Sequence, residues 1–332
     1  MDDLLKSKID LMIDNFHILK TDFKWESNLP KHFGAMIYAT SGKRVDPELI
    51  KTVKQYIKDE TGWMSAFRGL NIFPLSCLLS LQGDYKTCFK DMQRVFEQLR
   101  VLGFKNSTYL PLAAFTIVKE VPEHAWAEKL HRMNSFYENM KKNHFWLTSA
   151  DDYVFAAVLG ATNLNVDETS SRIEECYQIL NASGFYKGND LQTLSHILAL
   201  GEEPVKDKCN KAVNLYHKLA ENKCKLNYHG LASLGVLTLI TPEGSNTVSE
   251  LIEVNNYLYD NDGYGFWGID KLFRSILSAN LISDYYVDSI NDGILQITMC
   301  NSISAIMIAQ QQATIAAVCA CSAAAASAGS AG

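Results

Sequence analysis

The sequence predicts an all-α protein of tandem helical hairpins, each of about 41 residues, stacked as a HEAT-like α-solenoid or closed into an α/α toroid. Two periodic series support this prediction. The first is a large apolar residue, often after glycine, behind an amphipathic stretch: Trp63, Phe104, Phe145, Phe185, Leu226 and Phe266. The second has the same period: Tyr56, Phe96, Tyr137, Tyr177, Tyr216 and Tyr257. Two independent series with one period indicate a repeated structural unit. The aromatic residues of these series are expected to pack between units rather than to form a ligand cage.

One helix of each unit is amphipathic. In residues 88–102 the apolar side chains recur at i, i+4 and i+7, and residues 209–220 show the same pattern. These helices have start signals, which suit N-cap or N1 positions, at Asp46-Pro47, Asp84, Pro122, Asp167 and Pro204. They end near Gly62, Gly103 and Gly184, where a left-handed C-cap residue is expected.

The other helix of each unit is short and apolar on nearly all sides. Examples are residues 110–118, 153–159, 191–200 and 231–240. Such a helix is buried on most of its surface. Each unit therefore has one inner helix and one outer, half-exposed helix, and stacking of the units is needed to bury the apolar faces.

The period divides the chain into three parts. Residues 1–31 are expected to form an N-terminal capping helix, with Leu4, Ile9, Met12, Ile13 and Phe16 on its apolar face. Residues 32–283 form the helical-repeat domain. Residues 284–332 form a C-terminal helix, uncharged from residue 293 onward, and a tail rich in Ala, Ser and Cys.

The C-terminal part leaves several alternatives open. Residues 293–332 contain no charged side chain and no histidine, and the end of the chain is of low complexity. We expect a helix that packs on the repeats or on a second subunit and so makes a homo-oligomer. A membrane contact through residues 293–332 is an alternative, although polar residues such as Asn301 oppose insertion. A disordered tail, or a tail that is itself modified as a peptide, is a further alternative.

Composition and charge exclude several classes of protein. Apolar residues make up 47% of the chain and charged residues 20%, an ordinary globular balance. The net charge of −6 argues against a nucleic-acid binder, which usually has a basic domain or stripe. The eight cysteines form no CxxC pair, and the N-terminal segment lacks the apolar core of a signal peptide. These features predict a cytoplasmic protein with reduced thiols.

Polar residues gather where the inner helices begin, at Asp151, Asp152, Asp190, His229 and Asp270. In a repeat array these positions lie on the same edge. The simplest interpretation is N-capping, because such side chains bond the free amides of a helix start. The alternative is an acid–base site at this rim, with Asp151, Asp152, Asp190 and His229 as candidate catalytic residues.

Four residues are candidates for ligand binding: His144, His196, Asp270 and Trp267. His196 lies inside an apolar helix, where a histidine is more often a hydrogen-bonded core residue than a ligand. Trp267 lies in Gly263–Gly268, which has the spacing G-x-G-x-x-G but follows no strand, so a dinucleotide site is not expected. The polar candidates of successive units, Asp151, Asp190, His229 and Asp270, are about 40 residues apart and show no metal-binding spacing, so we expect no metal and no cofactor.

Two stretches carry a resemblance to a known family: Leu147-Thr-Ser-Ala-Asp-Asp-Tyr153, and residues 184–200, which read GFYKGNDLQTLSHILAL. Together they resemble an uncharacterised bacterial family, mainly from Gram-positive species, that is catalogued as a domain of unknown function. The resemblance covers most of the chain. It implies a bacterial cytoplasmic protein, and it supplies no catalytic residues.

The function favoured by the sequence is a non-catalytic scaffold that binds a protein or peptide partner, because solenoids expose an extended concave surface. The alternative is an enzyme of the α/α-toroid type with an Asp/His site at the rim, a prediction that rests on analogy of fold. The sequence alone does not decide between them. An open arc would favour binding, and a closed ring with converging Asp and His residues would favour an enzyme.

Overall fold

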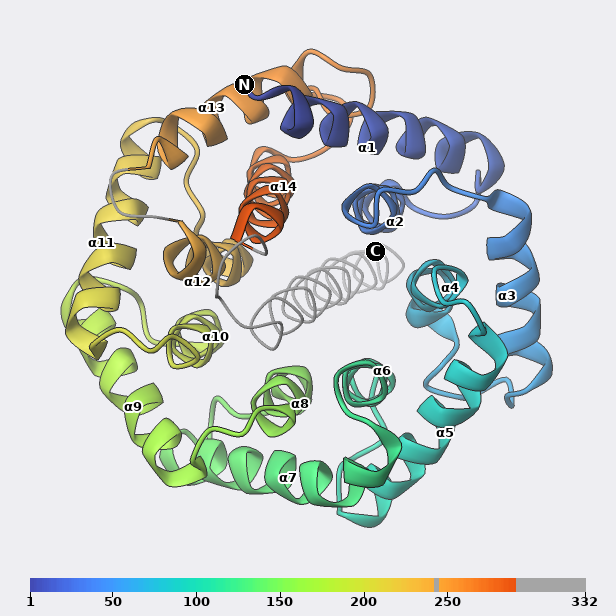
Figure 1. Ribbon diagram of the computed structural model, residues 1–332, viewed down its shortest axis with the longest axis horizontal. Coiled ribbons are helices and arrows are strands. Elements are labelled where there is room, and N and C mark those ends of the chain that lie inside the picture. Colours follow the sequence, from blue (N-terminus) through green and yellow to red (C-terminus); the bar gives the residue numbers. More distant parts are fainter. Residues whose placement is uncertain (242–244, 291–332) are drawn as a thin grey trace, which may run out of the picture.

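The fold is all-helical, as the sequence predicts. The computed structural model describes residues 1–241 and 245–290, and this part of the chain contains 14 α-helices and no β-strand. The odd-numbered helices form an outer ring and the even-numbered helices an inner ring (Figure 1). The outer helices are α1 (Asp3–Asp22), α3 (Pro47–Asp59), α5 (Tyr85–Val101), α7 (Trp126–Asn143), α9 (Val166–Ala182), α11 (Val205–Glu221) and α13 (Thr247–Tyr259). The inner helices are α2 (Asn28–Thr40), α4 (Ile72–Ser80), α6 (Leu110–Glu120), α8 (Tyr153–Ala161), α10 (Asn189–Leu198), α12 (Leu231–Ile240) and α14 (Lys271–Ile290).

The ring is closed, because α1 lies beside α13 and α14 packs against α1 and α2 (Figure 1). The amine of Met1 pairs with Glu253 of α13 at 2.8 Å, and the Tyr257 hydroxyl donates to Asp10 at 2.6 Å. The arrangement is therefore the closed toroid and not the open solenoid. Residues 1–31, expected to form a capping helix, contain α1 and the first turn of α2.

An aromatic cluster lies inside the closure. The His32 ring stacks on Phe16 with ring centroids 3.9 Å apart, and Tyr264 meets His32 edge-on at 4.6 Å. All three side chains are fully buried. The first two helices and the connection before the last are thus joined by a shared core.

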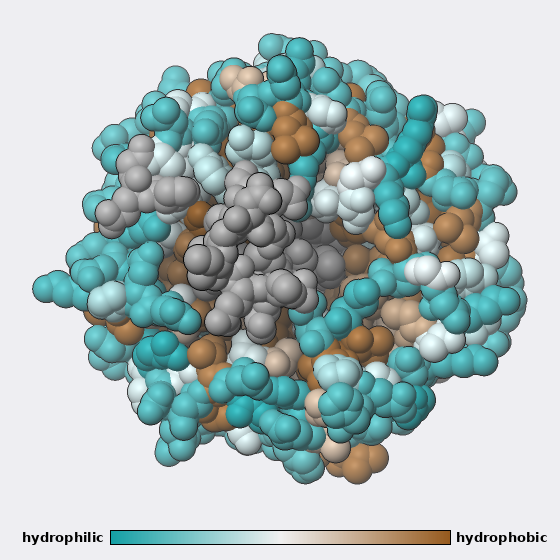
Figure 2. Space-filling model, viewed as in Figure 1, coloured by the Kyte–Doolittle hydropathy of each residue, from teal (hydrophilic) through white to brown (hydrophobic). Residues whose placement is uncertain are grey.

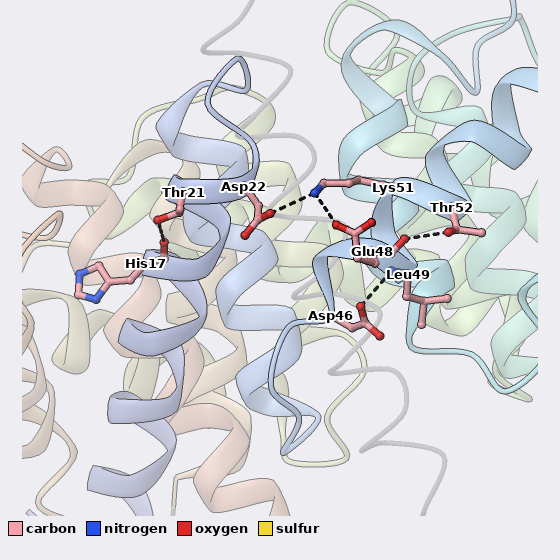
Figure 3. Close-up of polar contacts among 8 residues, drawn as sticks. All are labelled: His17, Thr21, Asp22, Asp46, Glu48, Leu49, Lys51 and Thr52. Atoms are coloured by element: carbon pink, nitrogen blue, oxygen red, sulfur yellow. Dashed lines mark hydrogen bonds and ion pairs between the residues drawn. The ribbon is translucent and has the colours of Figure 1, made fainter.

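The starts of the outer helices follow the predicted capping chemistry in most units. The Asp46 carboxylate accepts from the Leu49 amide at 3.0 Å at the start of α3 (Figure 3). One turn later Lys51 binds both Glu48, at 2.7 Å, and Asp22 at the end of α1, at 3.1 Å, and so links neighbouring outer helices (Figure 3).

The prediction for the start of α9 was wrong. This helix begins at Val166, and the Asn165 side chain accepts from the amides of Asp167 and Glu168. Asn165 is therefore the N-cap, and Asp167 lies inside the first turn, where a carboxylate favours the positive end of the helix dipole.

The ends of the outer helices are partly as predicted. Gly103 and Gly184 have φ angles of +97° and +100°, the left-handed conformation expected of a C-cap glycine. Gly62 does not adopt it. At the end of α11 the left-handed position is held by Lys223, with a φ of 60°.

The inner helices are buried nearly all round, as their composition predicts. Every residue of α8 from Tyr153 to Gly160 is buried. Gly160 allows α8 to lie directly against α7, because a Cβ at this position would be 2.7 Å from the backbone of Met133. Figure 2 shows hydrophilic side chains round the outside of the ring and apolar ones nearer its centre.

Two sets of connections define two rims. The first rim consists of the outer-to-inner connections, residues 23–27, 60–71, 102–109, 144–152, 183–188, 222–230 and 260–270. The second rim consists of the inner-to-outer connections, residues 41–46, 81–84, 121–125, 162–165, 199–204, 241 and 245–246. The predictions for residues 293–332 lie outside the described residues. Within the part that is described, none of the helices combines the length and the apolar character needed to cross a lipid bilayer.

Candidate functional site

Contacts at the first rim link a connection with the next connection or with the inner helix of a neighbouring unit. In order round the ring, these contacts link Phe23 with Phe73, Asn71 with Thr108, Lys105 with Tyr153, Asp151 with Asn189, Asp190 with His229, and Tyr264 with His32. The candidate residues from the sequence therefore do share one edge. They meet as neighbouring pairs along the rim and not as one convergent cluster.

Asp151 and Asp152 shape the start of α8. The Ser149 amide donates to Asp152 Oδ2 at 3.0 Å, and the Ser149 side chain in turn accepts from the Asp152 backbone, which makes a capping box. Asp151 accepts from the Ser149 hydroxyl and, at 2.9 Å, from the Asn189 side chain at the start of α10. The two carboxylates fix the helix start and its link to the next inner helix.

Asp152 has the most perturbed carboxyl group at this rim. Its residue is 2% exposed, and burial raises its pKa to about 8, with a further contribution from Asp151 that outweighs the bond from the Ser149 amide. Burial and the same two carboxylates raise the pKa of nearby Tyr109 to about 12. Asp152 is therefore protonated at neutral pH, and its burial keeps it from solvent.

Asp190 and His229 form a pair between the starts of α10 and α12. Asp190 Oδ1 lies 3.4 Å from His229 Nδ1, and both side chains are more than a third exposed. Asp270 is different, because its carboxylate accepts from the Leu272 amide at 2.7 Å and so caps α14. The pair resembles an acid–base couple in composition, but its length and exposure make it a weak surface contact.

His144, at the end of α7, and His196, inside the inner helix α10, lie near each other. His144 Nε2 is 2.8 Å from Glu174 Oε2, out of hydrogen-bond alignment, and the His144 ring packs on Tyr177 at 4.3 Å. His196 is 1% exposed and neither ring nitrogen has a hydrogen-bond partner. Burial, with the nearby His144, lowers the pKa of His196 to about 3. Within residues 1–241 and 245–290, the expected hydrogen bond to His196 is absent.

The glycine-rich segment Gly263–Gly268 is a compact turn. A Cβ on Gly268 would lie 2.0 Å from the Gly263 carbonyl oxygen, and a Cβ on Gly263 would lie 2.2 Å from the Phe16 ring. The glycines are therefore required by close packing of the backbone on itself and on α1. Between them the turn exposes Phe266 and Trp267, whose side chains are 75% and 94% exposed.

Exposed apolar side chains are the main feature of the first rim. In the described residues, ten of thirteen large hydrophobic side chains that are exposed lie in its connections, and two more, Val101 and Tyr259, end the helices that lead into it. Leu4 is the exception. The ten are Trp25, Trp63, Met64, Leu70, Phe145, Trp146, Tyr186, Tyr228, Phe266 and Trp267.

This feature was missed by the sequence reasoning, which took the aromatic series as packing between units. The series divides: Phe104, Phe185 and Leu226 are buried, whereas Trp63, Phe145 and Phe266 are exposed. The expectation was wrong for these three. A signal was present, because four of the five tryptophans fall just after an amphipathic helix.

None of the polar candidates lines either of two grooves on the described part of the chain. A groove of about 500 Å³ lies between α3 and α5, with Tyr56, Tyr85 and Lys86 among its lining residues. A second groove of about 410 Å³ lies between α7 and α9 and includes Lys142 and Glu174. Within residues 1–241 and 245–290, no three His, Cys, Asp or Glu side chains are placed to hold a metal ion. What the first rim can do chemically is to bury aromatic side chains against another surface.

Comparison with known proteins confirms the resemblance predicted from the two motifs. The model of a family described as protein of unknown function, DUF4003, matches residues 15–312. The chain is also similar to the uncharacterized protein YeaA of Bacillus subtilis, with 25% identity over 320 residues that cover 95% of this chain and 94% of the relative. No solved structure matches the chain.

Proposed function

We propose that this chain, which belongs to the DUF4003 family of proteins of unknown function, is a non-catalytic scaffold that docks on a macromolecular surface through its first rim. The observation that carries the proposal is the restriction of exposed aromatic side chains to that rim. In its described residues the second rim has no large hydrophobic side chain that is exposed.

The physical reason is the free energy of hydration. A fully exposed tryptophan keeps about 200 Å² of largely apolar surface in water, and burying such area stabilises a complex by about 25 cal/mol per Å². Trp25, Trp146 and Trp267 are 101%, 91% and 94% exposed. Gatherings of this kind on one face of a soluble domain mark interaction sites.

The closed ring changes which kind of binding the fold favours. A solenoid that binds a peptide uses the long groove on its concave side. Here α1 and α14 join the two ends (Figure 1), so the surfaces that face outward are two rims and an outer wall. A rim suits a broad partner that covers several connections at once.

The enzyme alternative has one observation in its favour, the protonated carboxyl group of Asp152 beside Asp151. Its position argues for a structural role, because the carboxyl group lies in a capping box and is buried. The Asp190–His229 pair is open to solvent and joins two helix starts. We therefore rank an acid–base site below docking.

Photo-crosslinking in cells tests the docking proposal. A photoreactive amino acid replaces Trp63 or Trp267 on the first rim and, as matched controls, Lys43 or Glu202 on the second rim. Both control residues are exposed. We expect adducts only from the first rim. Equal yields from both rims would show that the aromatic side chains do not mark the docking surface.

A further inference from the structure

We infer that the surface covered by the first rim is the interfacial layer of a lipid bilayer that contains anionic headgroups. This inference rests on the proposed docking function and names its partner. Three properties of the rim carry it: the distribution of its apolar side chains, their chemical type and the charges between them.

The distribution favours a planar partner. Six of the seven connections expose a large apolar side chain, and Val101, 87% exposed, directly precedes the seventh. The exposed apolar side chains are distributed over different connections of a closed ring (Figure 1). Only a surface about as wide as the ring itself can cover them together.

A protein partner fits this distribution less well. In protein interfaces the aromatic residues that dominate the binding energy cluster near the centre and are surrounded by weaker contacts. Here Trp25 and Trp146 belong to connections between different pairs of helices, α1–α2 and α7–α8, which lie on opposite sides of the ring (Figure 1). Binding to a bilayer does not require such a central cluster, because each exposed side chain can insert independently.

The chemical type of the exposed side chains suits the interface between lipid and water. Four are tryptophan and two are tyrosine, whose rings have an apolar body and one polar hydrogen-bonding group. These two residue types are enriched at the headgroup level of membrane proteins. Phe145 and Phe266 each lie next to a tryptophan and supply deeper apolar contacts.

The charges of the first rim suit anionic headgroups better than those of the rest of the chain do. Exposed lysines stand in four of its connections: Lys24, Lys105, Lys187, Lys223 and Lys225. The first rim has four exposed acidic side chains, and three of them lie in the last connection, residues 260–270. The second rim instead exposes five acids, at Asp46, Asp84, Glu123, Glu202 and Glu203, against Lys43 and Arg44. A protein with a net charge of −6 would thus approach an anionic surface with its first rim.

The intrinsic fluorescence of the full chain tests the inference. Four of the five tryptophans are on the first rim and the fifth, Trp126, is buried at 4% exposure, so the emission reports mainly on the rim. Vesicles of phosphatidylcholine and phosphatidylglycerol in equal parts should shift the emission to the blue. Brominated lipids in the same vesicles should quench it. High salt and pure phosphatidylcholine should both weaken binding.

Variants of the full chain locate the contact. Replacing Trp63, Trp146 and Trp267 together by serine should lower the vesicle partition coefficient by about a hundredfold or more. Among the described residues, Leu4 is the exposed large apolar residue that lies neither in the first rim nor at the end of a helix leading into it, so Leu4→Ser should leave partition unchanged. Circular dichroism of each variant shows whether the fold is kept.

Each outcome bears on one of the two proposals. No blue shift and no sedimentation with vesicles overturns the bilayer inference. Adducts to a protein from Trp63 and Trp267 would then leave the docking function standing with a protein as partner. Vesicle binding that persists in the triple variant would show that lipid contacts another part of the chain and also overturns the inference. Absence of both vesicle binding and rim-specific adducts removes both proposals.

Discussion

The free energy of unfolding of the natural chain should fall as pH rises, and substitution of Asp152 by asparagine should remove most of this fall. The pKa of this carboxyl group is about 8 in the folded protein and 3.8 in its ordinary state. Below pH 4 both the folded and the unfolded chain hold the proton. Between pH 4 and pH 8 the unfolded chain releases it while the folded chain keeps it, so folding becomes less favourable as pH rises.

The size of the effect follows from the shift of the pKa. About four units at 1.36 kcal/mol each give a loss on the order of 5 kcal/mol, complete above pH 8. Asparagine keeps the acceptor for the Ser149 amide and carries no charge, so the capping contact survives. The Asp152→Asn variant should therefore be more stable than the natural chain at pH 8 and similar to it at pH 4.

Urea unfolding followed by circular dichroism at a series of pH values measures this difference. Asp270→Asn is the matched control, because Asp270 is also a helix cap but is exposed. The reasoning fails if the unfolding midpoints of Asp152→Asn and the natural chain run parallel from pH 4 to pH 8. A variant with raised stability that has also lost a cellular activity would instead favour the enzyme alternative.

Three further substitutions test the packing. His196→Leu should raise the free energy of unfolding by about 1–3 kcal/mol at neutral pH, because two buried nitrogens without partners are removed. As pH falls from 6.5 toward 3, only the unfolded histidine gains a proton, so the natural chain loses stability. His196→Leu should reduce this loss. A series of thermal melts at these pH values checks both effects. Gly160→Ala should lower the free energy of unfolding by about 3 kcal/mol, because the added Cβ meets the Met133 backbone. Gly83→Ala is the control, because Gly83 has open space around it, and it should leave this free energy nearly unchanged. Urea titration measures both. Gly263→Ala should lower both the melting temperature and vesicle binding, because its Cβ would strike the ring of Phe16; loss of vesicle binding alone would contradict a role in ring closure.

The helices were predictable from the sequence because burial controls their composition. The apolar segments 110–118, 153–159, 191–200 and 231–240 coincide closely with α6, α8, α10 and α12. A helix buried on every side must be apolar on every side, so the pattern can be read without the neighbours. The start of α9 was misplaced because Asn165 and Asp167 have similar capping preferences, and only the path of the chain selects between them.

The exposed aromatic side chains were not predictable in this way. The position after an outer helix is apolar in every unit, yet Phe185 is buried and Trp63 is exposed. For Trp63 and Phe266 the difference lies in the length of the connection. In the longer connections 60–71 and 260–270, Phe67 and Ile269 are buried, so the apolar residues before them are free to face outward. Which of several apolar residues enters the core depends on a loop path that periodicity does not specify.

The closure of the ring and the display of its first rim depend on the same residues. The turn that exposes Phe266 and Trp267 also presents Tyr264 to His32 and lays the Gly263 backbone on the Phe16 ring. Elsewhere on the rim, Asp151–Asn189 and Asp190–His229 link the start of α10 with the connections of the two neighbouring units. In an open solenoid each connection would be rotated relative to the last, and the exposed side chains would follow a superhelix. Closure places them on one circle, so the polar residues that first suggested an active site are better understood as links between the parts of the proposed docking surface.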